Sequence, residues 1–244
     1  MAFVAGNQTR LITGAFDLSA FTTQVSFSSS VATIERTPLT ATAMEYIAGQ
    51  ESHTFSVSSM LDDASTAGSY WATLTGNHAA GTLLPVTVAP GGFAAGNAAW
   101  LAEAYELNLS PTSTASGGVD MGIDYQVTGA AAAGQALAAH AAVTATGNGS
   151  AVDGTAATTN GGIAHLHVTA VGGTTPELDV TIEHSVNGST SWATLATFTQ
   201  VTTATASQRV VVAAGTSVRR YLRVAYTVAG TNPTYTIAVA FARS

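Results

Sequence analysis

The sequence contains no cysteine and no lysine, and only 9% of its 244 residues are charged. Without cysteine the chain cannot form a disulfide, a thiolate zinc site or a cysteine nucleophile, so its stability must come from packing and assembly. Without lysine it lacks Schiff-base chemistry, and with seven arginines as its only basic residues it has no polybasic patch for nucleic acid. The absence of cysteine leaves the compartment undetermined.

Long apolar runs and a secretion leader are also missing. No run approaches the roughly 18 residues that a membrane-spanning helix needs. The N-terminus, Met1 to Gly6, lacks a charged segment followed by an apolar one. We therefore expect a chain that neither spans a membrane nor carries a secretion signal.

What remains is apolar and small: 46% of the residues are hydrophobic, and Gly, Ala, Ser and Thr make up much of the rest. A surface with so few charges must consist largely of small neutral residues or be buried against other subunits. Composition therefore favours an oligomer. The length exceeds one average domain of roughly 100 to 150 residues, which favours two domains.

A period of two in hydrophobicity predicts strands in the first half of the chain. The clearest is residues 119–127, where apolar and polar side chains alternate, and its predicted antiparallel partner is residues 100–109. Further strands are expected at 10–18, 24–29 and 53–59, with a long polar loop between the last two. One short helix is predicted to begin near Asp62–Asp63 and to continue through Tyr70, Trp71 and Leu74.

The composition changes near residue 129 to small, flexible residues typical of a connection, so we expect domains at 1–136 and 137–244. Asn187-Gly188 predicts a tight hairpin turn, because both residues tolerate positive φ. Short strands separated by turns predict a sandwich in the second domain; they are expected at 163–170, 178–184, 192–198, 209–212, 221–228 and 235–241. Residues 1–136 hold ten acids and two arginines, a balance of −8, and residues 137–244 hold four acids and five arginines, a balance of +1.

Three segments of the first domain carry a resemblance to a known family. They are Phe16-Asp17-Leu18-Ser19-Ala20-Phe21, Val25 to Ser30, and Ala43-Met44-Glu45-Tyr46-Ile47-Ala48-Gly49. In this order they resemble the major tail tube proteins of siphophages, especially those that infect actinobacteria. Ala48 stands where those relatives carry proline, which removes a rigid turn residue, while Gly49 keeps the permissive backbone.

The second domain resembles a β-sandwich module found at the C-terminus of phage virion proteins. The resemblance is carried by Ala164 to Ala170, Glu183-His184-Ser185, Trp192-Ala193 and Arg219 to Val224. Together the two resemblances imply an all-β fold: a tail-tube β-sandwich or barrel with one short helix, followed by a second, Ig-like or jelly-roll-like sandwich that faces outward and decorates the tube.

The function that the resemblance implies is structural, without catalysis, metal or cofactor. Such subunits form hexameric rings that stack into a tube, and the tube conducts DNA during ejection. The implied partners are further copies of the chain, the tape measure protein and viral DNA in the lumen, and the tail terminator and tail tip proteins, with no membrane. The implied location is the phage tail of the virion, assembled in the cytoplasm of the bacterial host.

Two sets of residues are assigned within this picture. A negative bore repels phosphates, so we expect several of Asp120, Asp124, Glu103 and Glu106, on the central hairpin, to point into the lumen. The segment 33–51 matches the position of the family's loop to a neighbouring subunit, and within it we expect Glu45, Tyr46, Ile47 and Gly49 to make that contact.

Readings as an enzyme or metal protein are weaker. His165 and His167 share a strand face and could bind a metal together with His184, but no further ligand lies at a diagnostic spacing, so we expect them to pack among Thr and Ser. Asp62–Asp63 is favoured as a helix cap over a glycosidase pair. No Gly-x-Ser-x-Gly elbow or phosphate loop is present.

The second domain leaves two further alternatives open. Arg219, Arg220 and Arg223 form the one basic cluster and could contact DNA or an anionic glycan, although a salt link to the acidic first domain is favoured. Aromatic residues could stack on host sugars, although core packing is favoured; these residues are Trp192, Tyr221, Tyr226 and Tyr235. The competing functions are thus a glycan-binding adhesin and a capsid-decorating protein.

Overall fold

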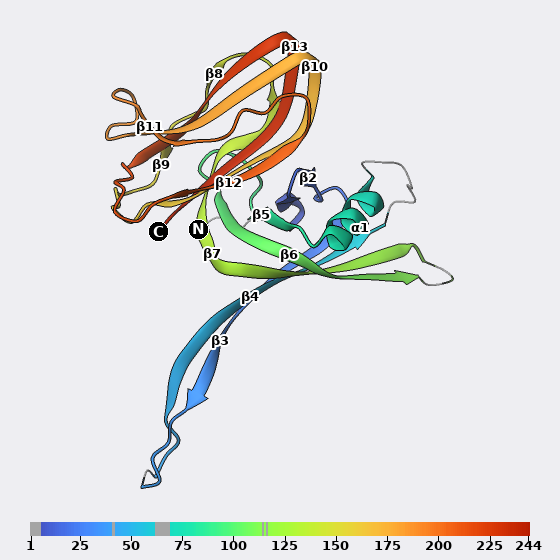
Figure 1. Ribbon diagram of the computed structural model, residues 1–244, viewed down its shortest axis with the longest axis vertical. Coiled ribbons are helices and arrows are strands. Elements are labelled where there is room, and N and C mark those ends of the chain that lie inside the picture. The colour runs from blue at the N-terminus through green and yellow to red at the C-terminus, as the bar shows by residue number, and fades with distance from the viewer. Residues whose placement is uncertain (1–5, 41, 62–68, 114, 116) are drawn as a thin grey trace. The chain divides into compact units, whose positions relative to one another are not determined.

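The computed structural model describes residues 6–40, 42–61, 69–113, 115 and 117–244 of the chain. Across these residues the regular structure is β-strand apart from one α-helix, α1 (Tyr70–Ala80), and one 3₁₀ turn, η1 (Gly6–Gln8) (Figure 1). The predicted all-β fold with one short helix is confirmed. No helix among the described residues is long and apolar enough to cross a membrane.

The chain divides into two compact units, and neither is a single stretch of sequence. Unit 1 comprises Met1–Ala20, Leu84–Ala102 and Ala132–Ser244, and unit 2 comprises Phe21–Leu83 and Glu103–Ala131. Strands β6 (Ala98–Ser113) and β7 (Val119–Val143) each run from one unit into the other. Unit 1 thus takes segments from both expected domains, and a division into domains 1–136 and 137–244 stays a prediction.

Unit 2 is built on an antiparallel sheet in the order β3, β4, β7, β6. Strand β3 (Thr22–Glu35) pairs with β4 (Tyr46–Met60), and β4 pairs with the first part of β7. The predicted hairpin of residues 100–109 and 119–127 is confirmed, with longer strands than expected. Alternation along the strands produces one buried face, because every second side chain points to the same side; it includes Phe55, Val57, Met121, Ile123 and Tyr125.

The helix of unit 2 is capped at both ends, by a side chain at its start and by a left-handed glycine at its end. The Ser69 hydroxyl accepts a hydrogen bond from the Ala72 amide at the first turn, and Gly81 ends the helix in the left-handed conformation with φ of 57°. Tyr70 and Leu74, one turn apart, are buried, and the Tyr70 hydroxyl bonds to that of Ser59. Asp62–Asp63, the expected start, lie outside the described residues.

The segment between the two Ser-rich strands is a hairpin arm and not the long polar loop that the sequence suggested. β3 and β4 remain paired out to Glu35 and Tyr46, so only residues 36–45 connect them. The loop prediction is therefore wrong for residues 33–35 and 46–51, which lie in strands. Figure 1 shows the arm leaving the sheet of unit 2 as a two-stranded ribbon. A ribbon can carry side chains at fixed positions along its length, because cross-strand hydrogen bonds hold its backbone.

Unit 1 is organised by two long strands, β10 (Gly162–Ser185) and β13 (Tyr221–Arg243), which pair along nearly their whole length. Both bend near their middle, where Gly173 and Gly230 have φ of 105° and 112° and where the register shifts. Any Cβ at these glycines would approach the opposing backbone to 2.6 or 2.5 Å. The bends let one strand pair supply both layers of a sandwich.

The core of the sandwich lies between the two halves of these strands. Leu166 and Val168 of the first half of β10 share one cluster with Val180 and Ile182 of the second half. The segments predicted as separate strands at 163–170 and 178–184, and at 221–228 and 235–241, are therefore halves of continuous strands.

Shorter strands complete unit 1. Strands β11 (Ala193–Thr197) and β12 (Ala206–Val212) pair with β10, and β8 (Gly147–Asn148) and β9 (Val152–Asp153) pair with β13. On the other side of β13 the sheet continues through the second part of β7 and the start of β6 to β5 (Leu83–Ala89), β1 (Arg10–Thr13) and β2 (Phe16–Asp17).

Two local predictions in this region are wrong. The Ala- and Gly-rich stretch after residue 129 is strand up to Val143, because small side chains let β7 lie close against β13. The predicted hairpin forms, since β10 and β11 pair antiparallel around Asn187-Gly188, but its turn is not the expected two-residue one, because Gly188 but not Asn187 has positive φ. The Asn187 side chain instead accepts hydrogen bonds from the amides of Ser189 and Thr190. A polar side chain that caps its own loop competes with the tighter turn.

Gly134 should be indispensable to the packing of β7. An added Cβ would lie 2.3 Å from the Phe241 carbonyl oxygen and 2.6 Å from the Ala242 Cα, and these are backbone atoms that cannot move aside as a flexible side chain can. We expect Gly134→Ala to lower the free energy of unfolding by about 1–3 kcal/mol, the usual cost of overpacking. Gly118→Ala, at an exposed glycine with nothing within 4 Å of the added atom, is the control and should change it little. Equal urea midpoints for the two variants would contradict this packing.

Candidate functional surfaces

One exposed face of the sheet of unit 2 carries polar side chains on all four strands, and we call these the polar face; Met60 of β4, in register with Asp120 and 54% exposed, lies on the same side. Ser26, Ser56 and Asp124 lie side by side in register on β3, β4 and β7. The Ser56 hydroxyl donates to Asp124 Oδ1 at 2.8 Å, and the Asn108 amide of β6 donates to Asp124 Oδ2 at 3.4 Å. The polar face consists of Gln24, Ser26, Ser56, Ser58, Asn108, Ser110, Asp120 and Asp124, all exposed.

The four acids predicted to share one surface divide between two faces. Asp120 and Asp124 are exposed on the polar face, whereas Glu106 is buried. Exposure along β6 shows why: Tyr105 and Leu107 are exposed, but Asn108 is exposed as well, so the alternation shifts by one residue there. Half-buried Glu103 lies two residues before Tyr105 and four before Leu107, so these three side chains point to one face of β6. Glu106 is three residues from Glu103, so its side chain points to the other face of the strand.

Glu106 is the unusual acid of the four. Its side chain is 5% exposed, and neither carboxyl oxygen has a hydrogen-bond partner among the described residues. Burial raises the pKa of Glu106 to about 8, so the carboxyl is largely protonated at neutral pH. Its backbone carbonyl contacts the His78 ring of α1 at 3.1 Å. A neutral carboxyl on the helix side of the sheet adds no charge to the polar face.

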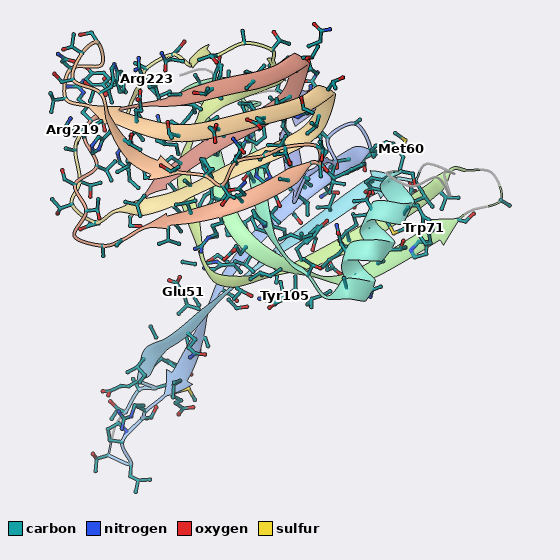
Figure 2. All side chains as sticks on the ribbon, turned by 45° about the horizontal axis from the view of Figure 1, so that its top comes forward. Glu51, Met60, Trp71, Tyr105, Arg219 and Arg223 are labelled. Atoms are coloured by element: carbon teal, nitrogen blue, oxygen red, sulfur yellow. The ribbon has the colours of Figure 1, made fainter. Side chains whose placement is uncertain are left out.

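The hairpin arm exposes large apolar side chains. Ile34 and Ile47 form a directly opposed pair across β3 and β4 and are 51% and 45% exposed. Tyr46 is 55% exposed and Leu39 fully so. Of the residues expected to contact a neighbouring subunit, Tyr46, Ile47 and Gly49 lie in β4 and Glu45 immediately precedes it. Figure 2 shows Glu51 near the base of the arm. Isolated exposed apolar residues are ordinary, but these lie together on one projecting ribbon, and the contact with a neighbouring subunit stays a prediction.

The outer edge of the sheet of unit 2 is open. Within the described residues β3 is paired in the sheet with β4 only, so no other strand is hydrogen-bonded along its outer side. Long edge strands are templates for pairing with another chain unless they are covered or interrupted by charges. Between Thr22 and Ile34 this edge carries no charged residue.

The three clustered arginines, Arg219, Arg220 and Arg223, are engaged within unit 1. Arg220 forms a bidentate pair with Asp153 at 2.7 and 2.8 Å, and Arg223 pairs with Glu183 at 2.7 Å. Arg219 donates to the Ser191 carbonyl at 3.0 Å. Figure 2 shows Arg219 and Arg223 in the same part of unit 1. The favoured salt link to the acidic first domain is thus replaced, for Arg220 and Arg223, by pairs within residues 137–244.

The aromatic residues of the second half divide between core and surface. Tyr235 is fully buried, with its hydroxyl donating to the Val201 carbonyl at 3.1 Å. Trp192 is half-buried, and the Arg223 guanidinium lies 4.3 Å from its ring centre. Tyr221 and Tyr226 are also half-buried. A guanidinium already stacked on Trp192 occupies a face that a sugar would need.

The histidines that could have formed a metal site do not converge. His165 and His167 are fully buried and share contact with Thr87, whereas His184 accepts from the Arg219 amide at 3.3 Å. No group of three or more His, Asp or Glu side chains among the described residues is arranged to hold a metal. Sequence reasoning placed His165 and His167 on one face but missed Thr87, because a contact 78 residues away leaves no local pattern.

Comparison with known proteins gives structural similarities only. No protein-family model matches the chain, and no curated protein matches it significantly. A chain from the virion of a native gene transfer agent particle is 15% identical, with a TM-score of 0.41, over 53% of this chain and 97% of its own. The SPP1 tail tube is 12% identical, with a TM-score of 0.42, over 52% and 77%. The sheath/tube terminator of an extracellular contractile injection system, PVC, is 13% identical, with a TM-score of 0.42, over 55% and 97%.

Replacing the buried carboxyl of Glu106 should make unit 2 less sensitive to alkali. With its pKa raised to about 8, folding favours the protonated acid, so its contribution is full below the unfolded value near 4.5 and is lost as pH rises toward 8. Glu106→Gln should therefore stabilise the fold more at pH 8 than at pH 5, measured by urea unfolding. Glu45→Gln, at an exposed acid, should leave both midpoints unchanged. A Glu106→Gln effect independent of pH would contradict the burial of an ionisable carboxyl.

Proposed function

We propose that the chain is the major structural subunit of the tail tube of a long-tailed bacteriophage, and not an enzyme. Copies would form hexameric rings that stack into a tube and conduct DNA during ejection. The observation that carries the proposal is the combination, in one sheet of unit 2, of a polar face whose charged residues are acids, an open edge strand and an apolar arm. The resemblance of residues 16–49 to siphophage tail tube proteins agrees with this combination.

The open edge of β3 supports closure of the sheet into a ring. A neighbouring copy that adds a strand there satisfies the backbone groups, and a ring leaves no edge free. The absence of charge along this edge favours such pairing, since natural monomers place charges or proline there to prevent it.

The apolar arm supports contact with another copy. Burying Ile34, Ile47, Tyr46 and Leu39 against protein would gain about 25 cal/mol for each Å² removed from water. An arm that projects from the sheet reaches beyond its own unit, so its natural partner is an adjacent subunit of the same ring or of the next one.

The polar face supports a bore for DNA. It presents hydroxyl, amide and carboxylate groups with no basic residue, so phosphates find no cation to pair with and are repelled by Asp120 and Asp124. The tape measure protein would occupy the same bore before DNA, with tail terminator and tail tip proteins at the two ends. The sandwich built on residues 137–244 would face outward, and the subunit would reach the virion after assembly in the host cytoplasm.

Disrupting the apolar arm should abolish assembly without unfolding the subunit. Ile34→Ser with Ile47→Ser removes an exposed opposed pair, so the urea midpoint should change little, while negative-stain images should show single subunits in place of rings or tubes. Val211→Ser, at a residue 59% exposed in unit 1, is the control and should assemble normally. Tubes formed by the arm variant as readily as by the control would refute this role. Shells or trimers from the unmodified chain would instead indicate a capsid-decorating protein.

Reversing charge on the polar face should make the bore retain DNA. In tubes of Asp120→Arg with Asp124→Arg, short duplex DNA should survive nuclease treatment inside the tube and be released at high salt, because the new guanidinium groups pair with phosphates. Glu177→Arg with Asp179→Arg, at two exposed acids two residues apart on β10, makes the same change in charge and is the control. DNA bound by the arginines of this control would lie outside the tube and would be digested by the nuclease. Protection by the control but not by the polar-face variant would place the bore elsewhere.

A further inference from the structure

Two buried histidines join opposite ends of the curved sheet of unit 1. His165 and His167 lie two residues apart on β10, on the side opposite Leu166 and Val168, which face the sandwich core. That side is covered by Thr87 of β5 and by the turn between β1 and β2, where Gly14 lies. We call His165, His167, Thr87 and Gly14 the histidine cluster. It links strands that are far apart in the order of the sheet.

Hydrogen-bond geometry assigns the protons of the histidine cluster. His167 Nδ1 lies 2.6 Å from the Gly14 carbonyl oxygen, which only accepts, so Nδ1 carries the proton. The neutral ring then accepts at Nε2, and the Thr87 hydroxyl, 2.8 Å away, donates to it. The same hydroxyl oxygen accepts from His165 Nδ1 at 3.0 Å. One chain of hydrogen bonds therefore runs from His165 through Thr87 and His167 to Gly14, with both rings neutral.

A further proton on either ring would break a hydrogen bond of the histidine cluster or lack an acceptor. On His167 Nε2 it would displace the proton that Thr87 donates, and on His165 Nε2 it would create a buried cation with no acceptor among the described residues. The ring centres are 5.8 Å apart, so two cations would also repel each other. Burial lowers the pKa of His165 well below its usual range and lowers that of His167 to about 4.

The surrounding charges also disfavour protonation. Arg209 of β12 lowers the pKa of His165, and His140 of β7 lowers that of His167. His140 also connects β2 with β10. Its Nδ1 lies 3.3 Å from a carboxylate oxygen of Asp17 in β2, and its Nε2 lies 2.8 Å from the hydroxyl of Thr169 in β10.

Unlike the two rings of the histidine cluster, His140 lies next to a carboxylate, that of Asp17. Burial, the largest effect, lowers the pKa of His140; Asp17 raises it, and Arg10 of β1 lowers it. A proton on His140 strengthens its attraction to Asp17, so this second link survives acidification better than the histidine cluster does.

We propose that the histidine cluster is an acid-sensitive latch, which holds the β1–β2 hairpin and β5 against β10 while its two rings are neutral and releases them when the rings are protonated. Release is local, because the sandwich core between the two halves of β10 and β13 contains no ionisable side chain other than the Tyr235 phenol among its described buried members. Protonation of the latch therefore destabilises the edge of unit 1 that contains β1, β2 and β5, and leaves the stability of the sandwich core unchanged.

Hydrogen exchange of the full chain, followed by mass spectrometry at pH 7 and pH 5, tests the latch directly. After correction for the intrinsic exchange rate, opening of residues 10–17 should become roughly 20-fold more frequent at pH 5, from a folded pKa of about 4 for His167 and an unfolded value of 6.5. Amides of 178–184 and 222–228 should keep their protection. The sign follows because the depressed pKa contributes stability above 6.5 that is lost as pH falls toward 4.

Variants separate the latch from general acid lability. His167→Gln removes the titrating ring and should abolish most of the pH dependence of residues 10–17, whatever its effect on stability at pH 7. His184→Gln, at a histidine of the same unit outside the cluster, should retain the full response. The proposal is overturned if the unmodified protein shows equal protection of residues 10–17 at both pH values, or if protection falls to the same extent throughout unit 1.

Discussion

A long strand with no second strand paired to its outer edge, among the described residues, is the constraint on which the account depends. Strand β3 spans 14 residues, and no charge between Thr22 and Ile34 discourages a second chain from pairing along that edge. Unpaired backbone groups can be hydrated in a monomer, but an open, uncharged edge is a persistent site of association. The small number of charges over the whole chain has the same consequence, since it leaves few other means of keeping copies apart.

The remaining features of unit 2 are consistent with that constraint. The arm continues β3 and β4 beyond the sheet and carries apolar residues at fixed positions, so edge pairing and apolar burial would occur together. The polar face lies on the side of the sheet opposite the helix, and Glu106 is buried on the helix side as a neutral carboxyl. Asp120 and Asp124 supply the negative charge of the polar face. Within unit 1, Arg220 pairs with Asp153 and Arg223 with Glu183, so these two guanidinium groups are already matched to acids of their own unit.

Local pattern predicted the strands well and their continuity poorly. Alternation identified the pairing of β6 and β7 and the half-strands of β10 and β13, because burial on one face of a sheet imposes a period of two on the sequence. It could not show that Gly173 and Gly230 bend continuous strands, since glycine marks turns and bends alike. The Ala-rich part of β7 was misassigned for a related reason: close packing against β13 requires small side chains, and small side chains also typify linkers. Among the candidate residues, Asp120 and Asp124 were placed on one face by their spacing, whereas Glu106 required the actual burial pattern. Thr87 depended on a long-range contact that no local signal records.

The most direct test of the central claim is a cryo-electron microscopy reconstruction of material assembled from the purified chain. The account predicts a hollow, ring-based particle in which β3 of each subunit is paired with a neighbouring copy and Asp124 faces the axial channel. A particle in which β3 remains unpaired and Asp124 points to the exterior would contradict it, as would a chain that stays monomeric at high concentration.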